Sequence, residues 1–334
     1  MSSNNPNRRE ALQAGAAGLA ALSLGGAVAA AEETNEQGVP LRPLGKTGEK
    51  VSLLALGGHH SARAKEEKDS LHLIQRAIHE GVTFMDNAWD YHNGGAEERM
   101  GKALEEAKLR DKVFLMTKVC GRTAKEARSN LEDSLRRLRT DHVDLWQFHE
   151  INYDNDPDRV FAHEGAIEVA LKAKEQGKIR YLGFTGHRNP DVHLKMLDKY
   201  AWDTVQMPLN VLDGTFRSFQ KNVLPKLNER GVAAIAMKSL GGDGGIVRTV
   251  KTPVEKALAY VFSLPIATLV SGMENERVLE QNLRIVRSFK RMDAEAMAAV
   301  EDEYKAAAAN GRYEAFKTTK NYDGPVHRKQ QLTG

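Results

Sequence analysis

Four ionisable side chains stand at the ends of apolar, strand-like runs in the first half of the sequence. They are the carboxylate, phenol, ammonium and imidazole of Asp86, Tyr91, Lys118 and His149. A phenol is a weak acid near neutral pH, with a reference pKa of about 10, and a nearby ammonium lowers that value. We expect Asp86 to hold Lys118 charged and His149 to orient a carbonyl oxygen. The set predicts protonation of an oxygen while another group attacks the attached carbon.

Each of these residues has a plainer explanation when it is taken alone. A strand-end aspartate often caps the next helix, a lysine is usually solvated, and a loop tyrosine often packs. Four of them at consecutive strand ends are harder to explain in that way. The sequence shows neither a Ser or Cys nucleophile motif nor histidines at metal-ligand spacing. We therefore expect no metal, and we expect the adjacent His59 and His60 to line a pocket.

The strands that would position these residues form a regular series. Short apolar runs, each bounded by polar or glycine residues, alternate with amphipathic helical patterns. Such alternation predicts a parallel sheet covered on its faces, and eight units predict a closed (β/α)8 TIM barrel. Active sites of these barrels lie at the C-terminal strand ends. The predicted strands are 52–58, 83–88, 113–118, 143–149, 180–186, 204–210, 233–239 and 267–273.

Further segments flank these units in the predicted barrel domain, residues 41–310. The opening LRPLGKTGEKV (41–51) has Gly-containing turn signals and predicts an N-terminal hairpin that closes the bottom of the barrel. One more helix is predicted at 292–309, and an extended, polar C-terminal tail follows at 311–334. We expect this tail to have irregular structure, and its position over the barrel mouth is left open.

The first 31 residues are different in kind. Arg8 and Arg9 end a polar segment, and an uncharged Ala/Gly/Leu-rich run follows at 11–31. This pattern is typical of a twin-arginine signal peptide, so we expect export by the twin-arginine machinery to the periplasm or cell envelope. A membrane anchor is the alternative, although alanine and glycine make the run a weak span. Residues 32–40 are predicted to be a linker.

Composition limits the partners. The 334 residues carry a net charge of +3 without a basic patch, which argues against nucleic-acid binding. A single cysteine, Cys120, excludes an internal disulfide and an iron–sulfur cluster, and we expect it to be a buried thiol. The oligomeric state is not predicted by any pattern.

The chain resembles the aldo-keto reductase family over residues 40–290. The resemblance rests on LGKTGEKVSLLALGG, FMDNAWDYHNGGAEERMGKAL, VFLMTKV, VDLWQFH and SGMENERVLEQN, with their D-x-A-x-x-Y and D-L-x-x-x-H spacings. It implies that Asp86, Tyr91, Lys118 and His149 are the family's catalytic tetrad. Tyr91 would be the general acid, or the base during oxidation, and a nicotinamide cofactor across the barrel mouth would supply the hydride.

The same resemblance implies the cofactor contacts, with some departures from the family. Thr185-Gly186 replaces the usual Ser-Asn pair, and Met237 stands where a tyrosine usually stacks. Glu274 stands near the position of a basic residue that contacts the 2′-phosphate of NADP, so the sequence favours NAD and leaves NADP open. The predicted contacts are Gly58, Asp86, Thr185, Gln206, Met237, Lys238, Leu240, Gly242, Gly272, Arg277, Gln281 and Asn282.

Aromatic and histidine side chains are the candidate walls of the substrate pocket. Trp89 lies between Asp86 and Tyr91 and is expected to line the pocket, together with His59 and His60. Asp90 is expected to be a solvated loop carboxylate, and Trp146 to lie in the outer core. The tail offers Tyr313, Phe316 and Tyr322 as further walls.

These features predict an NAD(P)-dependent oxidoreductase that interconverts a carbonyl and an alcohol on a small aldehyde, ketone or sugar. Free nicotinamide cofactor is scarce outside the cytoplasm, so export predicts a cofactor that is bound tightly and travels with the folded protein. Two alternatives use the same fold: an isomerase or epimerase with a trapped cofactor, and a non-catalytic redox-sensing subunit. The intact tetrad argues against the second of them.

Overall fold

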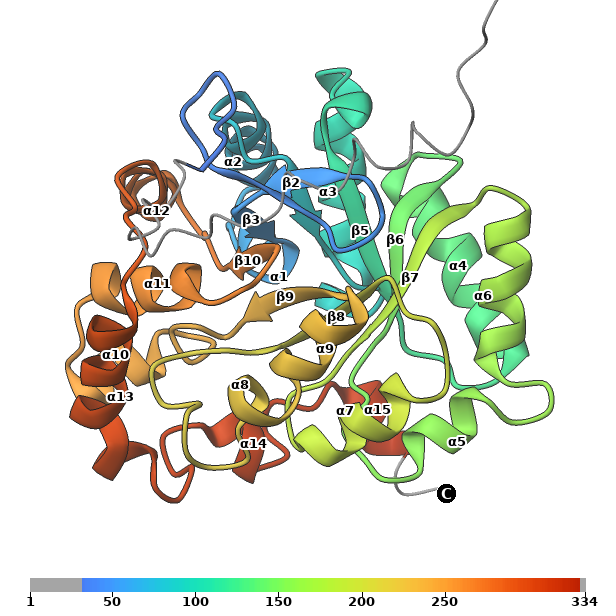
Figure 1. The fold of residues 1–334 in the computed structure, drawn as a ribbon. Helices are drawn as coiled ribbons and strands as arrows, with labels where there is room; N and C mark the ends of the chain where they lie inside the picture. The colour runs from blue at the N-terminus through green and yellow to red at the C-terminus, as the bar shows by residue number, and fades with distance from the viewer. Residues whose placement is uncertain (1–31, 331–334) are drawn as a thin grey trace, which may run out of the picture. The chain divides into compact units, whose positions relative to one another are not determined.

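Eight parallel strands close into a barrel in the computed structural model, which describes residues 32–330 (Figure 1). The strands follow one another around the barrel in chain order, and β10 closes the ring against β3. The predicted TIM barrel is confirmed. The barrel strands are β3 (Leu54–Gly57), β4 (Phe84–Asp86), β5 (Phe114–Val119), β6 (Val143–Phe148), β7 (Ile179–Thr185), β8 (Thr204–Pro208), β9 (Ala233–Met237) and β10 (Thr268–Ser271).

Helices connect the strands and cover the outside of the barrel (Figure 1). The longer ones are α2 (Glu67–His79), α3 (Gly95–Glu106), α4 (Ala124–Leu138), α6 (Ala166–Glu175), α7 (Pro190–Leu197), α9 (Leu224–Arg230), α11 (Val254–Ser263), α12 (Glu276–Arg287) and α13 (Ala294–Ala308). Shorter turns are α1 (Gly58–Ser61), η1 (Tyr91–Gly94), η2 (Arg110–Lys112), α5 (Asp156–Val160), α8 (Phe219–Asn222), α10 (Gly245–Val250), α14 (Ala315–Thr318) and α15 (Pro325–Gln330).

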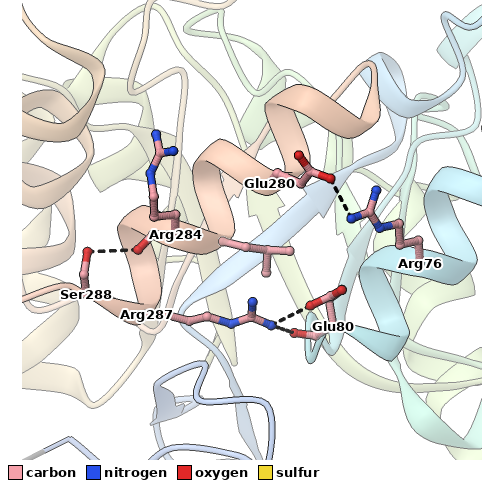
Figure 2. Close-up of a pocket in the computed structure, with 7 residues that line it drawn as sticks. Arg76, Glu80, Glu280, Arg284, Arg287 and Ser288 are labelled. Atoms are coloured by element: carbon pink, nitrogen blue, oxygen red, sulfur yellow. Dashed lines mark hydrogen bonds and ion pairs between the residues drawn. The ribbon is translucent and has the colours of Figure 1, made fainter.

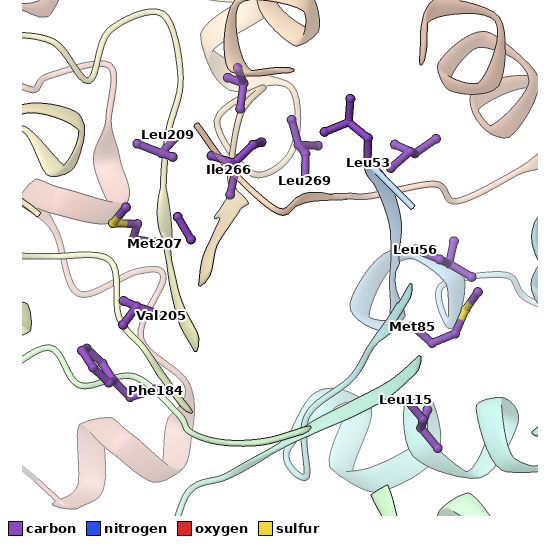
Figure 3. Close-up of a cluster of buried hydrophobic side chains, with 14 of the residues drawn as sticks. Leu53, Leu56, Met85, Leu115, Phe184, Val205, Met207, Leu209, Ile266 and Leu269 are labelled. Atoms are coloured by element: carbon purple, nitrogen blue, oxygen red, sulfur yellow. The ribbon is translucent and has the colours of Figure 1, made fainter. Parts of the chain in front are cut away.

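Alternation along the strands divides the core into two layers. Side chains on the outside of the strands, such as Met85 and Leu115, pack against the helices in one large apolar cluster (Figure 3). Trp146 is fully buried in this outer cluster, as expected. Side chains one position away, such as Phe84 and Met116, fill the inside of the barrel. This period of two also turns the last polar residue of several strands inward, toward the barrel mouth.

The antiparallel hairpin of β1 (Leu41–Pro43) and β2 (Lys50–Ser52) closes the lower end of the barrel. Leu44 and Val51 of this hairpin are fully buried in the interior cluster. Gly45 has a positive φ of 57°, and a Cβ there would lie 2.8 Å from backbone atoms of the loop before β9. The hairpin therefore fits against the barrel with no space for a side chain at that turn.

Two segments at the chain ends bear on the other predictions. The proposed signal peptide, residues 1–31, lies outside the described residues. Among the residues that are described, no helix is long and apolar enough to span a membrane. The tail, expected to be irregular, instead contains the short helices α14 and α15. Asp323 anchors it, accepting hydrogen bonds from Tyr153 at 2.5 Å and Arg188 at 3.1 Å.

Candidate active site

The C-terminal ends of the barrel strands surround a cavity of about 1130 Å³, which we call the mouth cavity. Its walls come from the loops after the strands, from α12 and from the tail. Most residues that the sequence nominated line it: His59, His60, Asp86, Tyr91, Lys118, His149, Thr185, Gln206, Met237, Lys238, Leu240, Gly242, Gly272, Arg277 and Gln281. Five nominated residues are not among the lining residues: Gly58, Trp89, Asn282, Tyr313 and Phe316.

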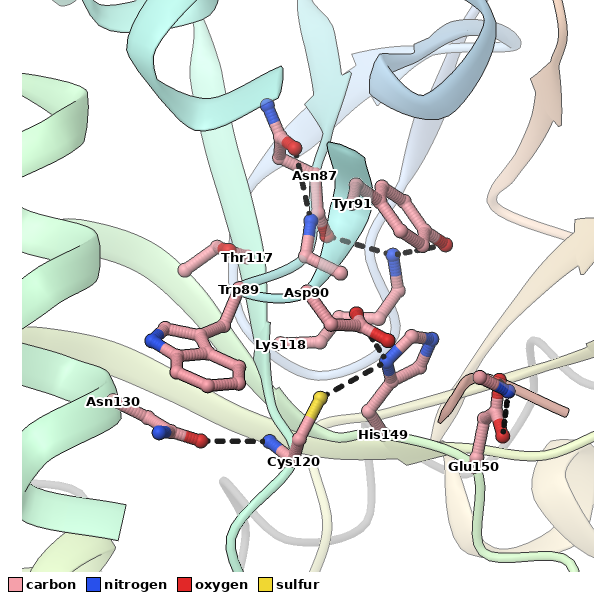
Figure 4. A network of polar contacts seen from close by, with 12 residues as sticks. Asn87, Trp89, Asp90, Tyr91, Thr117, Lys118, Cys120, Asn130, His149 and Glu150 are labelled. Atoms are coloured by element: carbon pink, nitrogen blue, oxygen red, sulfur yellow. Dashed lines mark hydrogen bonds and ion pairs between the residues drawn. The ribbon is translucent and has the colours of Figure 1, made fainter. Parts of the chain in front are cut away.

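A buried lysine links the strand-end groups (Figure 4). The Lys118 Nζ atom donates to Asp86 Oδ1 at 2.8 Å and to the Asn87 carbonyl at 2.7 Å, and it lies 3.5 Å from the Tyr91 hydroxyl. Lys118 is 1% exposed and Asp86 2% exposed, so this ion pair is shielded from water. The second Asp86 oxygen accepts from Gln206 Nε2 at 2.7 Å. These bonds fix the ammonium beside the phenol.

A tight turn directs Tyr91 into the cavity. Tyr91 begins η1, in which His92 and Asn93 adopt left-handed backbone angles with φ of 52° and 55°. His92 Nε2 lies 2.8 Å from the His59 carbonyl, which ties the turn to the loop after β3. Gly94, with a φ of 94°, packs so closely on Arg137 that a Cβ would lie 2.4 Å from the guanidinium carbon. The turn therefore requires glycine there.

Burial keeps the Tyr91 hydroxyl protonated. Burial raises the pKa of Tyr91 well above its ordinary value, and the negative charges of Asp86 and Asp90 raise it further. The expectation that Lys118 lowers this pKa is therefore wrong for this structure. The physical reason is first the desolvation of the buried phenol, and second the negative charge of Asp86, which also pairs with the Lys118 ammonium at 2.8 Å.

His149 has a buried carboxylate neighbour that the sequence did not predict. Its Nδ1 atom lies 3.1 Å from Asp90 Oδ1, and the Asp90 side chain is only 9% exposed. Burial opposes the charge of Asp90, but attraction to His149 outweighs it, so the pKa of Asp90 lies below its ordinary value. Burial lowers the pKa of His149, and the charge of Asp90 opposes this lowering. The expectation of a solvated Asp90 is wrong.

Trp89 points away from the cavity, toward α4 (Figure 4). Its indole nitrogen donates to Asp133 at 3.2 Å, and the Arg137 guanidinium lies 5.5 Å from the ring centre. Arg137 also donates to the Trp89 carbonyl at 2.9 Å. These contacts turn Trp89 outward and its neighbour Asp90 inward, the reverse of the arrangement expected from the sequence.

Glu150 is a lining residue that sequence reasoning missed. It directly follows His149, is 6% exposed, and adopts a left-handed φ of 50°. Its carboxylate accepts from the Gly324 amide at 3.0 Å, and burial raises the pKa of Glu150 well above its ordinary value. Lys238, across the cavity, has a pKa lowered by burial and partly restored by Glu150. The sequence signal that could have identified Glu150 is its position as a second ionisable residue, directly after the strand-end His149.

The loop after β9 crosses part of the cavity and is held at both sides. Asp243 pairs with Arg63 at 2.9 Å and lies 3.3 Å from His60, both from the region after β3. On the other side, Tyr322 packs on Gly242, where a Cβ would lie 2.9 Å from the ring. Among the tail aromatics, Tyr322 lines the cavity, whereas Phe316 is buried in the outer core.

Unpaired acceptors suit the cofactor predicted for this cavity. Gln206 Oε1 and Asn282 Oδ1 are buried and have no hydrogen-bond partner among the described residues. A nicotinamide carboxamide and an adenine amino group both offer N–H donors to such oxygens. Asn282 itself sits behind the lining residue Ser271 and donates to its hydroxyl at 3.0 Å. Gln206, which lines the cavity, therefore fits a nicotinamide carboxamide, whereas Asn282 lies behind the lining.

Gly58 has a packing role. A Cβ at Gly58 would lie 2.6 Å from the Asp86 carbonyl oxygen, so the loop after β3 packs directly on β4. At Gly272, by contrast, the neighbouring atoms belong to His60, and a Cβ would lie 2.6 Å from its ring. Gly272 thus brings the cavity wall close to His60, while Gly58 supports Asp86 from behind.

A separate hollow of about 520 Å³ lies between α2 and α12 (Figure 2). Charged pairs cross it, with Arg76 bonded to Glu280 at 2.7 Å and Arg287 to Glu80 at 2.8 Å. None of its lining residues lines the mouth cavity. Two ion pairs thus join α2 to α12 across it, so we assign it to helix packing.

Comparisons with known proteins agree with this geometry. The sequence profile of the Aldo/keto reductase family matches residues 53–255. Aldo-keto reductase YhdN of Bacillus subtilis is 31% identical over 212 residues, which cover 58% of this chain and 60% of that protein. L-galactose dehydrogenase of Arabidopsis thaliana is 28% identical, with 60% and 66% covered. 6-Dehydroglucose reductase of Novosphingobium aromaticivorans is 30% identical, with 65% and 74% covered.

Solved structures support the same fold. The holo form of an aldo-keto reductase from Bacillus halodurans superposes with a TM-score of 0.70 at 23% identity, covering 83% of this chain and 99% of that one. The chain spans less than two thirds of the length of the first two curated relatives, 60% and 66%. The profile match nonetheless includes the strands that carry Asp86, Lys118 and His149. The chain belongs to the aldo/keto reductase family.

Proposed function

We propose that the protein is an NAD(P)-dependent oxidoreductase that interconverts a carbonyl and an alcohol, with Tyr91 as the general acid or base. The observation that carries the proposal is the Lys118 ammonium, held by Asp86 at 2.8 Å and lying 3.5 Å from the Tyr91 hydroxyl inside the mouth cavity. Such a group donates a proton to an oxygen in the transition state. The bound nicotinamide supplies or accepts the hydride.

Each side chain has a distinct role in this proposal. Tyr91 gives its proton to the carbonyl oxygen, and the Lys118 ammonium stabilises the phenolate that remains. Asp86 keeps Lys118 in place, since its oxygens bond Lys118 and Gln206. His149, whose ring centre lies 5.5 Å from that of Tyr91, hydrogen-bonds the same substrate oxygen. The oxygen is thereby oriented before it is protonated.

The walls of the cavity favour a polar substrate. His59, His187, Glu150 and Lys238 line it beside Tyr91, and each offers hydrogen bonds. Two of the relatives are named for a sugar reaction, L-galactose dehydrogenase and 6-dehydroglucose reductase. We therefore propose a sugar or another polyhydroxylated aldehyde or ketone.

The held loop after β9 supports a cofactor that is bound tightly and exported with the folded protein. An ion pair on one side and Tyr322 on the other restrain this loop. Slow opening of such a loop slows cofactor release. A retained cofactor also permits the isomerase reaction, in which one substrate is oxidised and reduced again. Native mass spectrometry of protein from the cell envelope reports both cofactor and signal removal, and a bare protein would contradict retention.

The proposed activity is tested by oxidation of NADH and NADPH in the presence of aldoses and simple aldehydes. We expect substrate-dependent loss of nicotinamide absorbance and an alcohol product. A protein that binds the cofactor but neither reduces nor isomerises any of these carbonyl compounds would contradict the proposal. That result would favour a sensing subunit.

The raised pKa of Tyr91 predicts a pH dependence that differs between the two directions. Carbonyl reduction needs the protonated phenol, which persists until the pH exceeds the raised pKa, so this group should not reduce kcat/KM between pH 7 and 10. Alcohol oxidation needs the phenolate, so kcat/KM should rise by about tenfold per pH unit over that range. Steady-state kinetics in both directions check this. If kcat/KM for reduction begins to decrease before the pH has risen to 9, and kcat/KM for oxidation stops increasing there, the pKa of Tyr91 is lowered and the prediction is wrong.

Glu274 predicts the choice of cofactor. It lines the cavity next to Arg277, and its carboxylate would repel a 2′-phosphate by about 1 kcal/mol. We expect Glu274→Gln to improve NADPH affinity by about fivefold while NADH affinity changes little. Fluorescence titration of each cofactor measures this. Glu276→Gln is the matched control, because Glu276 pairs with Arg76 outside the cavity. Equal changes for both cofactors would contradict the prediction.

A further inference from the structure

Four side chains with metal-binding atoms converge beside the cavity. Asp90, Cys120, His149 and His327, which we call the Cys-His cluster, each place one ligand atom within 4.8 Å of the others. Cys120 is 0% exposed, His327 2% and His149 5%. They come from four separate segments: the loop after β4, the ends of β5 and β6, and α15. Sequence spacing therefore gives no sign of the cluster.

Two distances within the Cys-His cluster are close to those of a tetrahedral site. His149 Nδ1 lies 3.1 Å from Asp90 Oδ1 and 3.6 Å from Cys120 Sγ. Zinc bonds of about 2.3 Å to sulfur and about 2.1 Å to nitrogen or oxygen place tetrahedral ligands about 3.6 Å apart for N and S, and about 3.4 Å apart for N and O. Only small shifts would bring these three atoms onto one ion.

One member of the cluster, His327, is buried without a hydrogen-bond partner. Neither of its ring nitrogens has one among the described residues, whereas Asp90 Oδ1 has His149 Nδ1 as its ion-pair partner at 3.1 Å. A buried polar group without a partner is costly. His193 is also buried and unpartnered, but it belongs to no group of three or more metal-binding side chains in the described chain. His327 differs from His193 because it lies beside three other metal-binding side chains, not because it is buried.

The Lys329 and Gln330 end of α15 is also held near this point, because the Gln330 side-chain amide donates to the Cys120 carbonyl at 2.9 Å. Gly324 contributes as well, since a Cβ there would lie 2.7 Å from Asp90 Oδ2. The tail is thus fitted closely against Asp90 and Cys120, and it carries His327 into the cluster.

We propose that Asp90, Cys120, His149 and His327 bind one zinc ion, or a divalent transition metal of similar softness. One thiolate, two imidazoles and one carboxylate form a ligand set that suits zinc. The thiolate and carboxylate together balance the 2+ charge, so the loaded site is neutral inside the protein. The metal joins α15 to the barrel. This proposal goes against the expectation of no metal, which rested on sequence spacing alone.

A metal on Nδ1 also sets the protonation of His149, a step that rests on the proposed function. In Figure 4 the Nδ1 atom faces Asp90 and Cys120, and the other ring nitrogen lies on the side of Tyr91. An imidazole that is neutral and bound through Nδ1 carries its proton on Nε2. His149 is then a hydrogen-bond donor toward the substrate oxygen, whereas a neutral ring that donates from Nδ1 to Asp90 would be an acceptor there.

The test uses the full-length protein, stripped with a chelator and titrated with zinc and cobalt. We expect one bound equivalent by elemental analysis and, with cobalt, a thiolate-to-metal charge-transfer band. Cys120 is the chain's single cysteine, so Cys120→Ser should abolish that band. His327→Gln should weaken zinc binding by at least about 100-fold, because even outer-shell partners contribute about 10- to 100-fold. His193→Gln, the matched buried histidine, should leave it within about threefold.

Circular dichroism of each metal-free variant separates a lost ligand from a lost fold. Failure of folded wild-type protein to bind zinc or cobalt, or equal weakening by His327→Gln and His193→Gln, would overturn the proposal. None of these measurements uses turnover. A metal-binding protein in which Tyr91→Phe leaves activity unchanged would retain the metal site and refute the proposed function. A protein that loses activity on Tyr91→Phe but binds no metal would support the proposed function and refute the metal site.

Discussion

Replacing Tyr91 by phenylalanine is expected to lower kcat/KM for carbonyl reduction by about 10²- to 10⁴-fold, the usual contribution of a general acid. The substitution removes one hydroxyl, which lies 3.5 Å from Lys118 Nζ, and keeps the ring that packs between His59 and His149. Cofactor affinity should remain within about twofold, since the loss falls on the chemical step rather than on binding. Parallel kinetics and cofactor titrations separate these two effects.

The matched control is Tyr181→Phe. Tyr181 lies at the lower end of the barrel, where its hydroxyl bonds the Thr47 carbonyl at 3.1 Å. Its loss removes a phenol of the same kind far from the cavity, so we expect unchanged kinetics. Turnover that survives Tyr91→Phe would refute the assignment of the general acid. A simultaneous loss of cofactor binding would instead point to a disturbed turn at η1.

Replacing Lys317 by methionine is expected to reduce the free energy of unfolding by about 3–5 kcal/mol, as for other buried ion pairs that lose one partner. Lys317 is 0% exposed, and its Nζ atom donates to Asp213 at 2.6 Å and lies 2.9 Å from Glu314. The methionine fills similar space but leaves two carboxyl groups buried without a cation. Denaturation in urea at pH 7 measures the change.

The loss of stability in Lys317→Met should depend on pH, and the pKa of Asp213 determines the sign of this dependence. Burial raises the pKa of Asp213 to about 7 even with Lys317 present, and removal of the cation raises it further. A carboxyl group whose folded-state pKa exceeds its unfolded value destabilises the fold as the pH rises. The reduction in the free energy of unfolding caused by Lys317→Met should therefore be larger at pH 8 than at pH 5. Lys320→Met, at an exposed lysine of the same tail, should change stability little; a similar loss there would contradict the ion-pair explanation.

Strand periodicity is what made the position of the proposed catalytic residues predictable. Inward and outward positions alternate strictly, so the last inward residues of β4 and β5 and the residue after β6 had to meet at one rim. The parallel register bears this out, with Asp86 opposite Met116 and Lys118 opposite Gln147. The hairpin of β1 and β2 was also predictable, because its Gly-containing turn is specified by neighbouring residues in the sequence.

Loop and tail positions depend on contacts that are distant in sequence. Arg137, 48 residues after Trp89, bonds the Trp89 carbonyl and holds the indole toward α4, while Asp90 contacts His149. Asp323 bonds His187 at 3.1 Å across 136 residues. The tail residues show no helical or strand period that would place them. The direction of the pKa shift of Tyr91 does not follow from its neighbouring charges in the sequence, because it depends first on the desolvation of the buried phenol.

The closed position of the tail has a consequence for biosynthesis. Asp86, Lys118 and His149 leave the ribosome early, and the other cavity-lining residues up to Gln281 follow. The segment that carries Tyr322 and His327 is translated after them, and it packs against residues made well before it, since the ring centres of His149 and His327 lie 5.2 Å apart. Until that segment has been made, the mouth cavity of a nascent chain lacks this wall, so the tail can enclose the cavity only after the strands of the barrel have been synthesised.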